Sequence, residues 1–372
     1  MQTISSTTLR FQETWCRNDT LASLHSTNGS HQCILPLANI PIPSFKQEGW
    51  RILDVGGGLH TILLAMLTSG RKIDAYWPVE ADEHTRSIGN NVTKRLKSQY
   101  KAQLAPDFLR PTLPQDIELI TEQMVIDISP IHLLAANWSS SDIAGVAADR
   151  ARAAANSDET RGRLSSVERI RKWVVKHNTT CHFVFESEDF RLQHPDEWKR
   201  VTDSFGPPVG MDAALVSYSH RWRLYWTSFF RNDMIPQIRN NLHLNQVLDN
   251  DHVARTAIYS DTPPYIPANT EGIMMTRYVT VKRARNTQSI RDGTGLVRKR
   301  TATTELEAYE RPRIQELERI LGFKPGDTDA PELQALPEAT RERIRGGALG
   351  SGSDARLLTN ILEALPRLPG QR

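Results

Sequence analysis

The chain has 372 residues, 39% hydrophobic and 24% charged, a composition typical of a globular protein that can bury an α/β core beside a smaller lobe. Its 46 Lys and Arg residues against 43 Asp and Glu residues leave a formal net charge of +3, which indicates a polyanionic partner only weakly. The three scattered cysteines exclude a disulfide framework and a metal site built from a Cys pair. No apolar run approaches the roughly 20 residues of a membrane span, and the polar start does not resemble a signal peptide. We therefore expect a reducing compartment, no membrane and no metal.

Residues 1–47 are rich in Ser, Thr, Asn and Gln and end in a proline-containing stretch, which predicts an N-terminal extension with little core. Strands and helices then alternate: the predicted elements are strand 51–55, helix 59–67, strand 72–79, a helix ending near 96, strand 131–136, helix 164–175 and strand 181–185. Three prolines within 106–114 predict an insertion loop, and 213–219 with 224–230 are expected to form an antiparallel pair. This alternation predicts a doubly wound, mostly parallel sheet that binds ligands at the carboxyl ends of its strands.

The first strand runs into three glycines, and a second strand ends in an acid about twenty residues later. Glycines let the backbone turn tightly and approach a ligand, the following helix offers free N–H groups, and an acid at that strand end binds ribose hydroxyls. Dinucleotide and S-adenosylmethionine sites share this logic, but the G-x-G-x-x-G order that favours a pyrophosphate is absent. S-adenosylmethionine is therefore the expected cofactor, and the residues expected to contact it are Gly56, Gly57, Gly58, Thr61 and Glu80.

Further motifs follow in a fixed order along the chain: Lys72 to Glu80, Asp116, Gly162-Arg163-Leu164, Phe185-Glu186, His220 to Arg223 and Glu305 to Thr328. Together they resemble the catalytic domain of the C5-cytosine DNA methyltransferases, closest to the animal de novo group, over about residues 50–365. The resemblance implies a Rossmann-like, seven-stranded class I methyltransferase core with a small target-recognition lobe, and it places Asp116 at the adenine amino group. The implied boundaries are 48–231 for the core, 232–303 for the target-recognition-like region and 304–372 for C-terminal helices that return to the core.

The family's nucleophile is the clearest departure from the pattern. Where relatives carry Pro-Cys-Asn, this chain has Ser139, Ser140 and Ser141. In the resembling family a thiolate adds to C6 of a flipped-out cytosine and C5 then takes the methyl group. A thiol with a pKa of about 8.5 can do this at neutral pH, whereas a serine hydroxyl is far less acidic. We therefore expect a catalytically inactive or impaired homologue.

The other catalytic positions implied by the resemblance are Glu186, which would support N3 of the cytosine, and Arg221 and Arg223, which would hold the base carbonyl. Glu188 adds a second acid beside Glu186. On the cofactor side, Gly56 replaces the family's aromatic residue, and the segment after Arg343 lacks the family's aromatic and proline. Cofactor binding is expected to be weakened by these changes.

A basic stretch lies in the target-recognition-like region, and its expected DNA-binding residues are Lys282, Arg283, Arg285, Arg291, Arg298 and Lys299. Such a stretch predicts salt-dependent contacts to phosphates, although a solvated surface is the alternative. The resemblance further implies an active methyltransferase or a second copy of the chain as partner, and a nuclear location in a eukaryote or a cytoplasmic one otherwise. The alternative function is an active S-adenosylmethionine-dependent methyltransferase whose target needs no cysteine nucleophile.

Overall fold

The structure is a computed structural model, and the residues it describes are 49–138, 163–178, 180–188, 190–191, 195–236, 244–253, 273–274, 297–301, 309–310 and 312–368. The predicted N-terminal extension and Ser140 lie outside these ranges.

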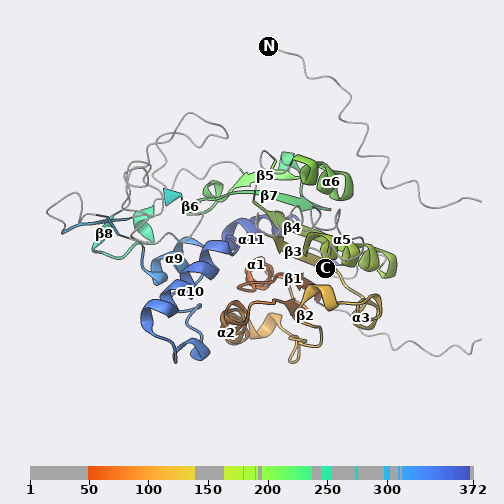
Figure 1. Cartoon of the computed structure of the whole chain (residues 1–372), viewed down its shortest axis with the longest axis horizontal. Helices are drawn as coiled ribbons and strands as arrows, with labels where there is room; N and C mark the ends of the chain where they lie inside the picture. The colour runs from red at the N-terminus through yellow and green to blue at the C-terminus, as the bar shows by residue number, and fades with distance from the viewer. Residues whose placement is uncertain are drawn as a thin grey trace, which may run out of the picture. The chain divides into compact units, whose positions relative to one another are not determined.

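A six-stranded sheet in the order β2-β1-β3-β4-β7-β5 forms the centre of the described chain (Figure 1). Its strands are β1 (Trp50–Val55), β2 (Ile73–Val79), β3 (Leu133–Trp138), β4 (His182–Ser187), β5 (Val209–Asp212) and β7 (Trp222–Thr227). The first four pair in parallel, and β7 runs antiparallel to both β4 and β5. The predicted mostly parallel α/β sheet is confirmed.

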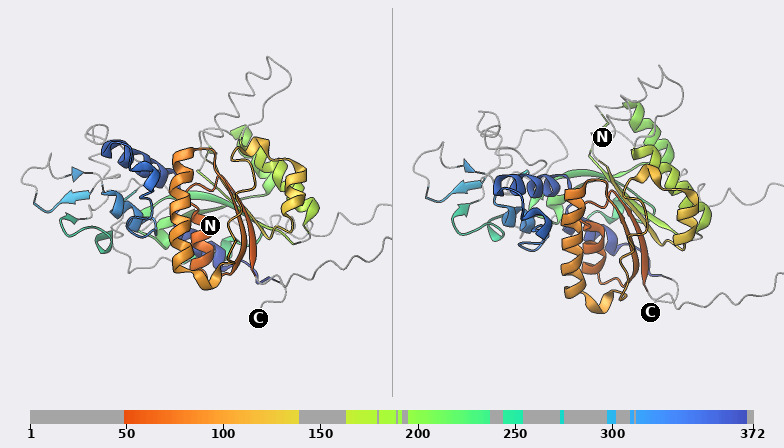
Figure 2. Two further views of the ribbon diagram at one scale, coloured as in Figure 1. Left: turned by 90° about the horizontal axis from the view of Figure 1, so that it is seen from below. Right: turned by 60° about the horizontal axis from the view of Figure 1, so that its bottom comes forward.

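Helices cover both faces of the sheet, which buries the apolar residues of its strands on two sides. One face packs against α1 (Thr61–Thr68), α2 (Glu83–Gln99), α9 (Ile314–Ile320), α10 (Glu338–Ser351) and α11 (Ala355–Glu363). The other packs against α3 (Glu122–Ile128), α5 (Arg163–His177) and α6 (Pro195–Phe205). Figure 2 shows α2 and α5 on opposite sides of the sheet, so the doubly wound arrangement is also confirmed.

Two helices that flank the carboxyl ends of the strands begin with an aspartate cap. The Asp82 carboxylate accepts the Thr85 N–H at 2.7 Å at the start of α2, and Oδ1 of Asp354 accepts the Arg356 N–H at 3.0 Å at the start of α11. Such caps satisfy backbone donors that have no partner within the helix. Helix α1 differs, because it follows the glycines and starts at His60 with a left-handed φ of 56° and no side-chain cap.

The described sheet has six strands instead of the seven predicted, and the reason lies beside β2. The segment 104–110 runs along this edge and makes backbone hydrogen bonds to it, from Ala105 N–H to Ile73 O and from Tyr76 N–H to Phe108 O. Between these bonds Pro106 sits in a tight turn closed by the Phe108 N–H on Ala105 O. Proline favours the second position of such turns and has no N–H to donate to a strand ladder. The predicted insertion loop thus lies along the sheet edge without forming a regular strand.

The predicted antiparallel pair exists, but its first strand was placed wrongly. The partner of β7 is β5, and the predicted strand 213–219 begins instead with a 3-10 helix, η3 (Ala213–Leu215). The carboxylate of Asp212 accepts the Ala214 N–H at 3.0 Å and the Arg221 N–H at 2.8 Å. Aspartate side chains that accept hydrogen bonds from nearby backbone N–H groups in this way end strands and start turns.

A smaller sheet joins β8 (His252–Val253), β10 (Val297–Lys299) and β11 (Tyr309–Glu310), and β6 (Ser219–His220) pairs with β9 (Ile273–Met274). Helix α9 meets the small sheet through Glu316, which is fully buried and contacts His252 Nδ1 at 2.8 Å. The same carboxylate accepts the Asp249 N–H at 2.8 Å. A buried carboxylate that accepts several hydrogen bonds fixes the position of its donors. The contacts of Glu316 with His252 and Asp249 therefore hold the small sheet against α9.

Candidate functional site

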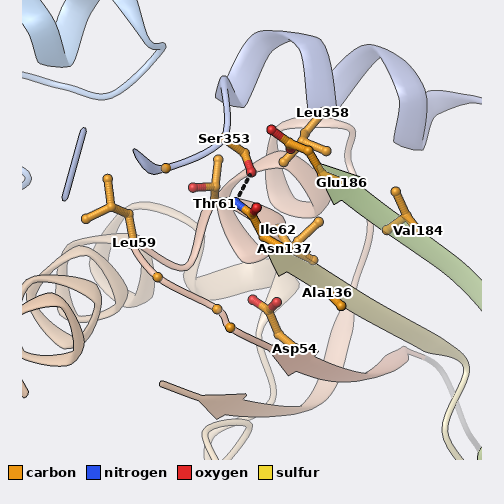
Figure 3. A pocket seen from close by; sticks show the side chains of 14 residues that line it. Asp54, Leu59, Thr61, Ile62, Ala136, Asn137, Val184, Glu186, Ser353 and Leu358 are labelled. Atoms are coloured by element: carbon orange, nitrogen blue, oxygen red, sulfur yellow. Dashed lines mark hydrogen bonds between the residues drawn. The ribbon is translucent and has the colours of Figure 1, made fainter. Parts of the chain in front are cut away.

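The carboxyl ends of β1, β3 and β4 open onto one cavity, which we call the central cavity. It is bounded by the glycine loop Gly56–Gly58, Thr61, Asn137, Glu186 and Ser353 (Figure 3). Its volume is only about 20 Å³, which is room for about one water molecule. A second, outer cavity of about 130 Å³ lies beside Val79, Gln115 and Asp116, and Gly56 borders both.

Gly56 has a φ of +70°, and a Cβ built there would lie 2.6 Å from the carbonyl oxygen of Asn137. Real Cβ atoms essentially never come that close to another heavy atom, and L-residues rarely adopt this φ. The close approach of the loop to β3 therefore explains why glycine stands where the resembling family has an aromatic residue.

Glu80, which directly follows β2, contacts the glycine loop. Its Oε2 accepts the Gly58 N–H at 3.1 Å, its Oε1 accepts the Asp82 N–H at 3.0 Å, and its side chain is buried. Asp116 lies at the outer cavity, exposed, with Oδ1 accepting the Glu118 N–H at 2.9 Å. The structure thus gathers Gly56–Gly58, Thr61 and Asp116 around two cavities that share Gly56, with Glu80 bonded to the glycine loop.

Sequence reasoning did not count Asp54 among the site residues, although it directly precedes the glycine loop. Its buried side chain lines the central cavity and accepts the Tyr76 hydroxyl at 2.6 Å. Burial raises the pKa of the Asp54 carboxyl to about 7 against the opposing effect of the Tyr76 hydrogen bond. Asn137 and Ser353 were also missed as members of the site.

Glu186 and Arg223 form a buried ion pair on neighbouring strands. The side chain of Glu186 projects from the end of β4 and its residue is 3% exposed, and its Oε1 lies 3.6 Å from Nε of Arg223 on β7. No described residue donates a hydrogen bond to either carboxylate oxygen of Glu186. Nη2 of Arg223 also lies 3.3 Å from Glu188, so the second acid expected from the sequence shares this arginine.

Arg221, just before β7, is 1% exposed, and none of its three guanidinium nitrogens has a hydrogen-bond partner among the described residues. Burial, and next the charge of Arg223, lower the pKa of Arg221 to about 10, while Glu186 and Asp354 act in the opposite direction. Burial also raises the pKa of the Tyr225 hydroxyl well above its ordinary value, and Glu186 adds to that shift. Buried donors and acceptors left unbonded are destabilising, so such a group marks a functional site more often than a structural one.

Other predicted site residues are not joined to this cluster by the described structure. Ser140, Lys282, Arg283, Arg285 and Arg291 lie outside the described residues, and Arg298 and Lys299 stand on β10 of the small sheet. Within the described ranges no three potential metal ligands come together, and no helix has the length and apolar character to cross a membrane.

No protein-family model and no curated protein matches this chain. Among solved structures, it is similar to the Dnmt2 methyltransferase of S. pombe, with a TM-score of 0.52 and 11% sequence identity over 85% of this chain and 98% of the other. A DNMT2 mutant from Spodoptera frugiperda gives a TM-score of 0.50 and 12% identity over 85% of this chain and 99% of the other. At such low identity the likeness concerns the fold alone: this chain has the α/β fold of the solved Dnmt2 methyltransferases.

Proposed function

We propose that this chain is a C5-cytosine DNA methyltransferase homologue that binds DNA and S-adenosylmethionine but does not complete the covalent reaction, acting as a regulatory or vestigial partner of an active enzyme. In a eukaryote its place of action is then the nucleus. The similar solved structures are methyltransferases with this fold, and the motif order described above supports the narrower assignment.

The observation that carries the proposal is the buried group of Glu186, Arg221 and Arg223, in which Glu186 lines the central cavity together with the glycine loop. Glu186 offers two carboxylate oxygens and Arg221 a planar set of donors, and no described residue fills their hydrogen-bonding capacity. A pyrimidine edge carries both a donor or protonatable nitrogen and a carbonyl acceptor, so it can engage the carboxylate and the guanidinium together. This is the role that the family resemblance gives to these positions.

The residues around the outer cavity fit the nucleoside part of the cofactor. Two backbone N–H groups fix the Glu80 carboxylate, which supports assigning it to the ribose hydroxyls, and Asp116 lines the outer cavity, which supports assigning it to the adenine amino group. The cavity of about 130 Å³ has room for a planar base. When bound, S-adenosylmethionine supplies the methyl group, and the residues of this chain bind and orient it.

The covalent addition to cytosine is expected to fail because Ser140 stands at the position of the nucleophile. An alkoxide is not available at neutral pH without a strong base, and the adduct at C6 of cytosine is the step that activates C5. Arg221, Arg223 and Glu186 can bind and orient a base, but none of them can replace a thiolate that attacks carbon. Binding without methylation is therefore the expected behaviour.

The test is transfer of a labelled methyl group from S-adenosylmethionine to a cytosine-containing DNA duplex, with DNA binding measured in parallel. We expect duplex binding that weakens with salt, no transfer by the native chain, and detectable transfer by Ser140→Cys. Ser139→Cys is the matched control, since it introduces the same thiol one residue away, and it should remain inactive. Robust transfer by the native chain would overturn the proposed inactivity in favour of a methyltransferase without a cysteine nucleophile. Absence of duplex binding would overturn the DNA-binding role.

A further inference from the structure

One side-chain hydrogen bond connects the end of β3 with the turn between α10 and α11. Nδ2 of Asn137 donates to Oγ of Ser353 at 3.1 Å, although 216 positions separate the two residues in the chain. Both residues border the central cavity together with the glycine loop and Glu186. Figure 3 shows the bonded pair lying between the loop and Glu186.

The two ends of this bond are held by rigid surroundings. The backbone of Asn137 lies so close to Gly56 that a Cβ on the glycine would be 2.6 Å from its carbonyl oxygen. Next to Ser353, Asp354 caps α11 and accepts the Ser217 hydroxyl at 2.6 Å. These contacts restrain the backbone at both ends, and rotation of the two side chains opens the bond without breaking them.

The sizes of the two cavities differ in a way that matters for the ligand. The outer cavity of about 130 Å³ can take a nucleoside base, whereas the central cavity of about 20 Å³ has room for about one water molecule. The amino-acid tail of S-adenosylmethionine or S-adenosylhomocysteine is far larger than a water molecule. Asn137, Ser353 and Glu186 line the central cavity together, so a ligand tail that enters this cavity competes with the Asn137 and Ser353 side chains for its small volume.

We infer that Asn137 and Ser353 form a latch that closes the central cavity, so that the closed chain accepts the adenosine part of its ligand and discriminates against the amino-acid tail. The inference rests on the proposed function, because it assigns to the same site a selectivity for tail-less adenine nucleosides. A hydrogen bond between neutral groups corresponds to about a fivefold change in an equilibrium constant, which sets the scale of the discrimination. A bond of this strength can open when a ligand binds, and its removal changes the binding affinity by an amount that calorimetry can measure.

The experiment is calorimetric titration of the full chain with adenosine and, separately, with S-adenosylhomocysteine, without any assay of methyl transfer. The variants are Ser353→Ala, Asn137→Ala and the two combined. Ser351→Ala is the matched control, because among the described residues the Ser351 hydroxyl bonds within α10, to Gly347 O at 3.0 Å and Ala348 O at 3.3 Å, and Ser351 is not among the residues that line the central cavity. The quantity compared is the affinity for S-adenosylhomocysteine divided by the affinity for adenosine.

We expect this ratio to rise about fivefold in Ser353→Ala, at least as much in Asn137→Ala, and not at all in Ser351→Ala. The double variant should gain no more than Asn137→Ala alone, since both changes remove the same bond. If both ligands bind and the ratio stays at the native value in all variants, the latch is refuted while the cofactor site stands. If neither ligand binds to the native chain or to any variant, the latch and the proposed cofactor site are refuted together.

Discussion

Replacing Gly56 with alanine tests the close approach on which the geometry of the site depends. The first cost is conformational, because a φ of +70° disfavours an L-residue by about 1 kcal/mol. The second is steric: the new methyl group would lie 2.6 Å from the Asn137 carbonyl oxygen, so the loop or β3 must shift, which costs about 1–3 kcal/mol in packed structures. The free energy of unfolding, measured by urea denaturation at 25 °C, should therefore fall by about 2–4 kcal/mol in Gly56→Ala.

Gly70→Ala separates these two costs. Gly70 has a similar φ of +80°, but a Cβ there would meet no atom within 4 Å. Only the conformational cost of about 1 kcal/mol remains. If Gly56→Ala and Gly70→Ala lose the same stability, the glycine loop does not press on β3, and the explanation for glycine at position 56 is wrong.

Three further predictions concern buried titratable groups. The Asp54 carboxyl has a folded pKa of about 7, above that of the unfolded chain, so its contribution to stability is present at pH 4 and is lost as the pH rises through 7. In urea denaturation, the native chain should lose up to about 4 kcal/mol of unfolding free energy relative to Asp54→Asn between pH 4 and pH 8. Parallel pH curves for the two proteins would contradict this prediction. Burial raises the pKa of the Cys181 thiol to about 12, so little reactive thiolate is present in the folded protein at pH 8. In a variant with the other two cysteines replaced, a maleimide at pH 8 should react with the folded protein at least about 100-fold more slowly than with the urea-unfolded protein. Equal reaction rates would show that the Cys181 thiol is accessible. Glu318 is fully buried, accepts the Thr328 N–H at 2.8 Å and forms an ion pair with Arg345 at 3.3 Å. In the same denaturation assay, Glu318→Ala should lower the free energy of unfolding by about 3–5 kcal/mol, because it leaves the Arg345 charge buried without its partner. A loss below about 1 kcal/mol would mean that the ion pair is not buried.

The parallel strands could be predicted because each is a short apolar run bounded by glycine, proline or polar residues. Strand β1 was predicted at 51–55 and observed as Trp50–Val55, and β2 was predicted at 72–79 and observed as Ile73–Val79. Strands buried on both faces carry this strong signal. Strand β5 was missed because Val209–Asp212 has only four residues and contains Gly210, while the apolar run just after it forms a turn around Asp212.

Parts of the site could be predicted where a strand end supplies the side chain. Glu80 and Glu186 stand at the ends of β2 and β4, and parallel strands bring such ends to one edge of the sheet. Asn137 and Ser353 could not be paired in this way, because their contact depends on how α10 and α11 return to the sheet. Contacts between residues so far apart in sequence leave no periodic pattern in either segment.

The packing of α11 against α1 has a consequence for how the protein is made. Helix α1 is apolar and buried nearly all round, and Leu357, Leu358 and Ile361 of α11 belong to the same apolar cluster. During synthesis α1 leaves the ribosome well before α11, so its apolar surface stays exposed to water until the ribosome has translated α11. Such an intermediate is prone to aggregation and suits chaperone binding, and premature termination before α11 would yield a sticky fragment rather than a smaller working unit.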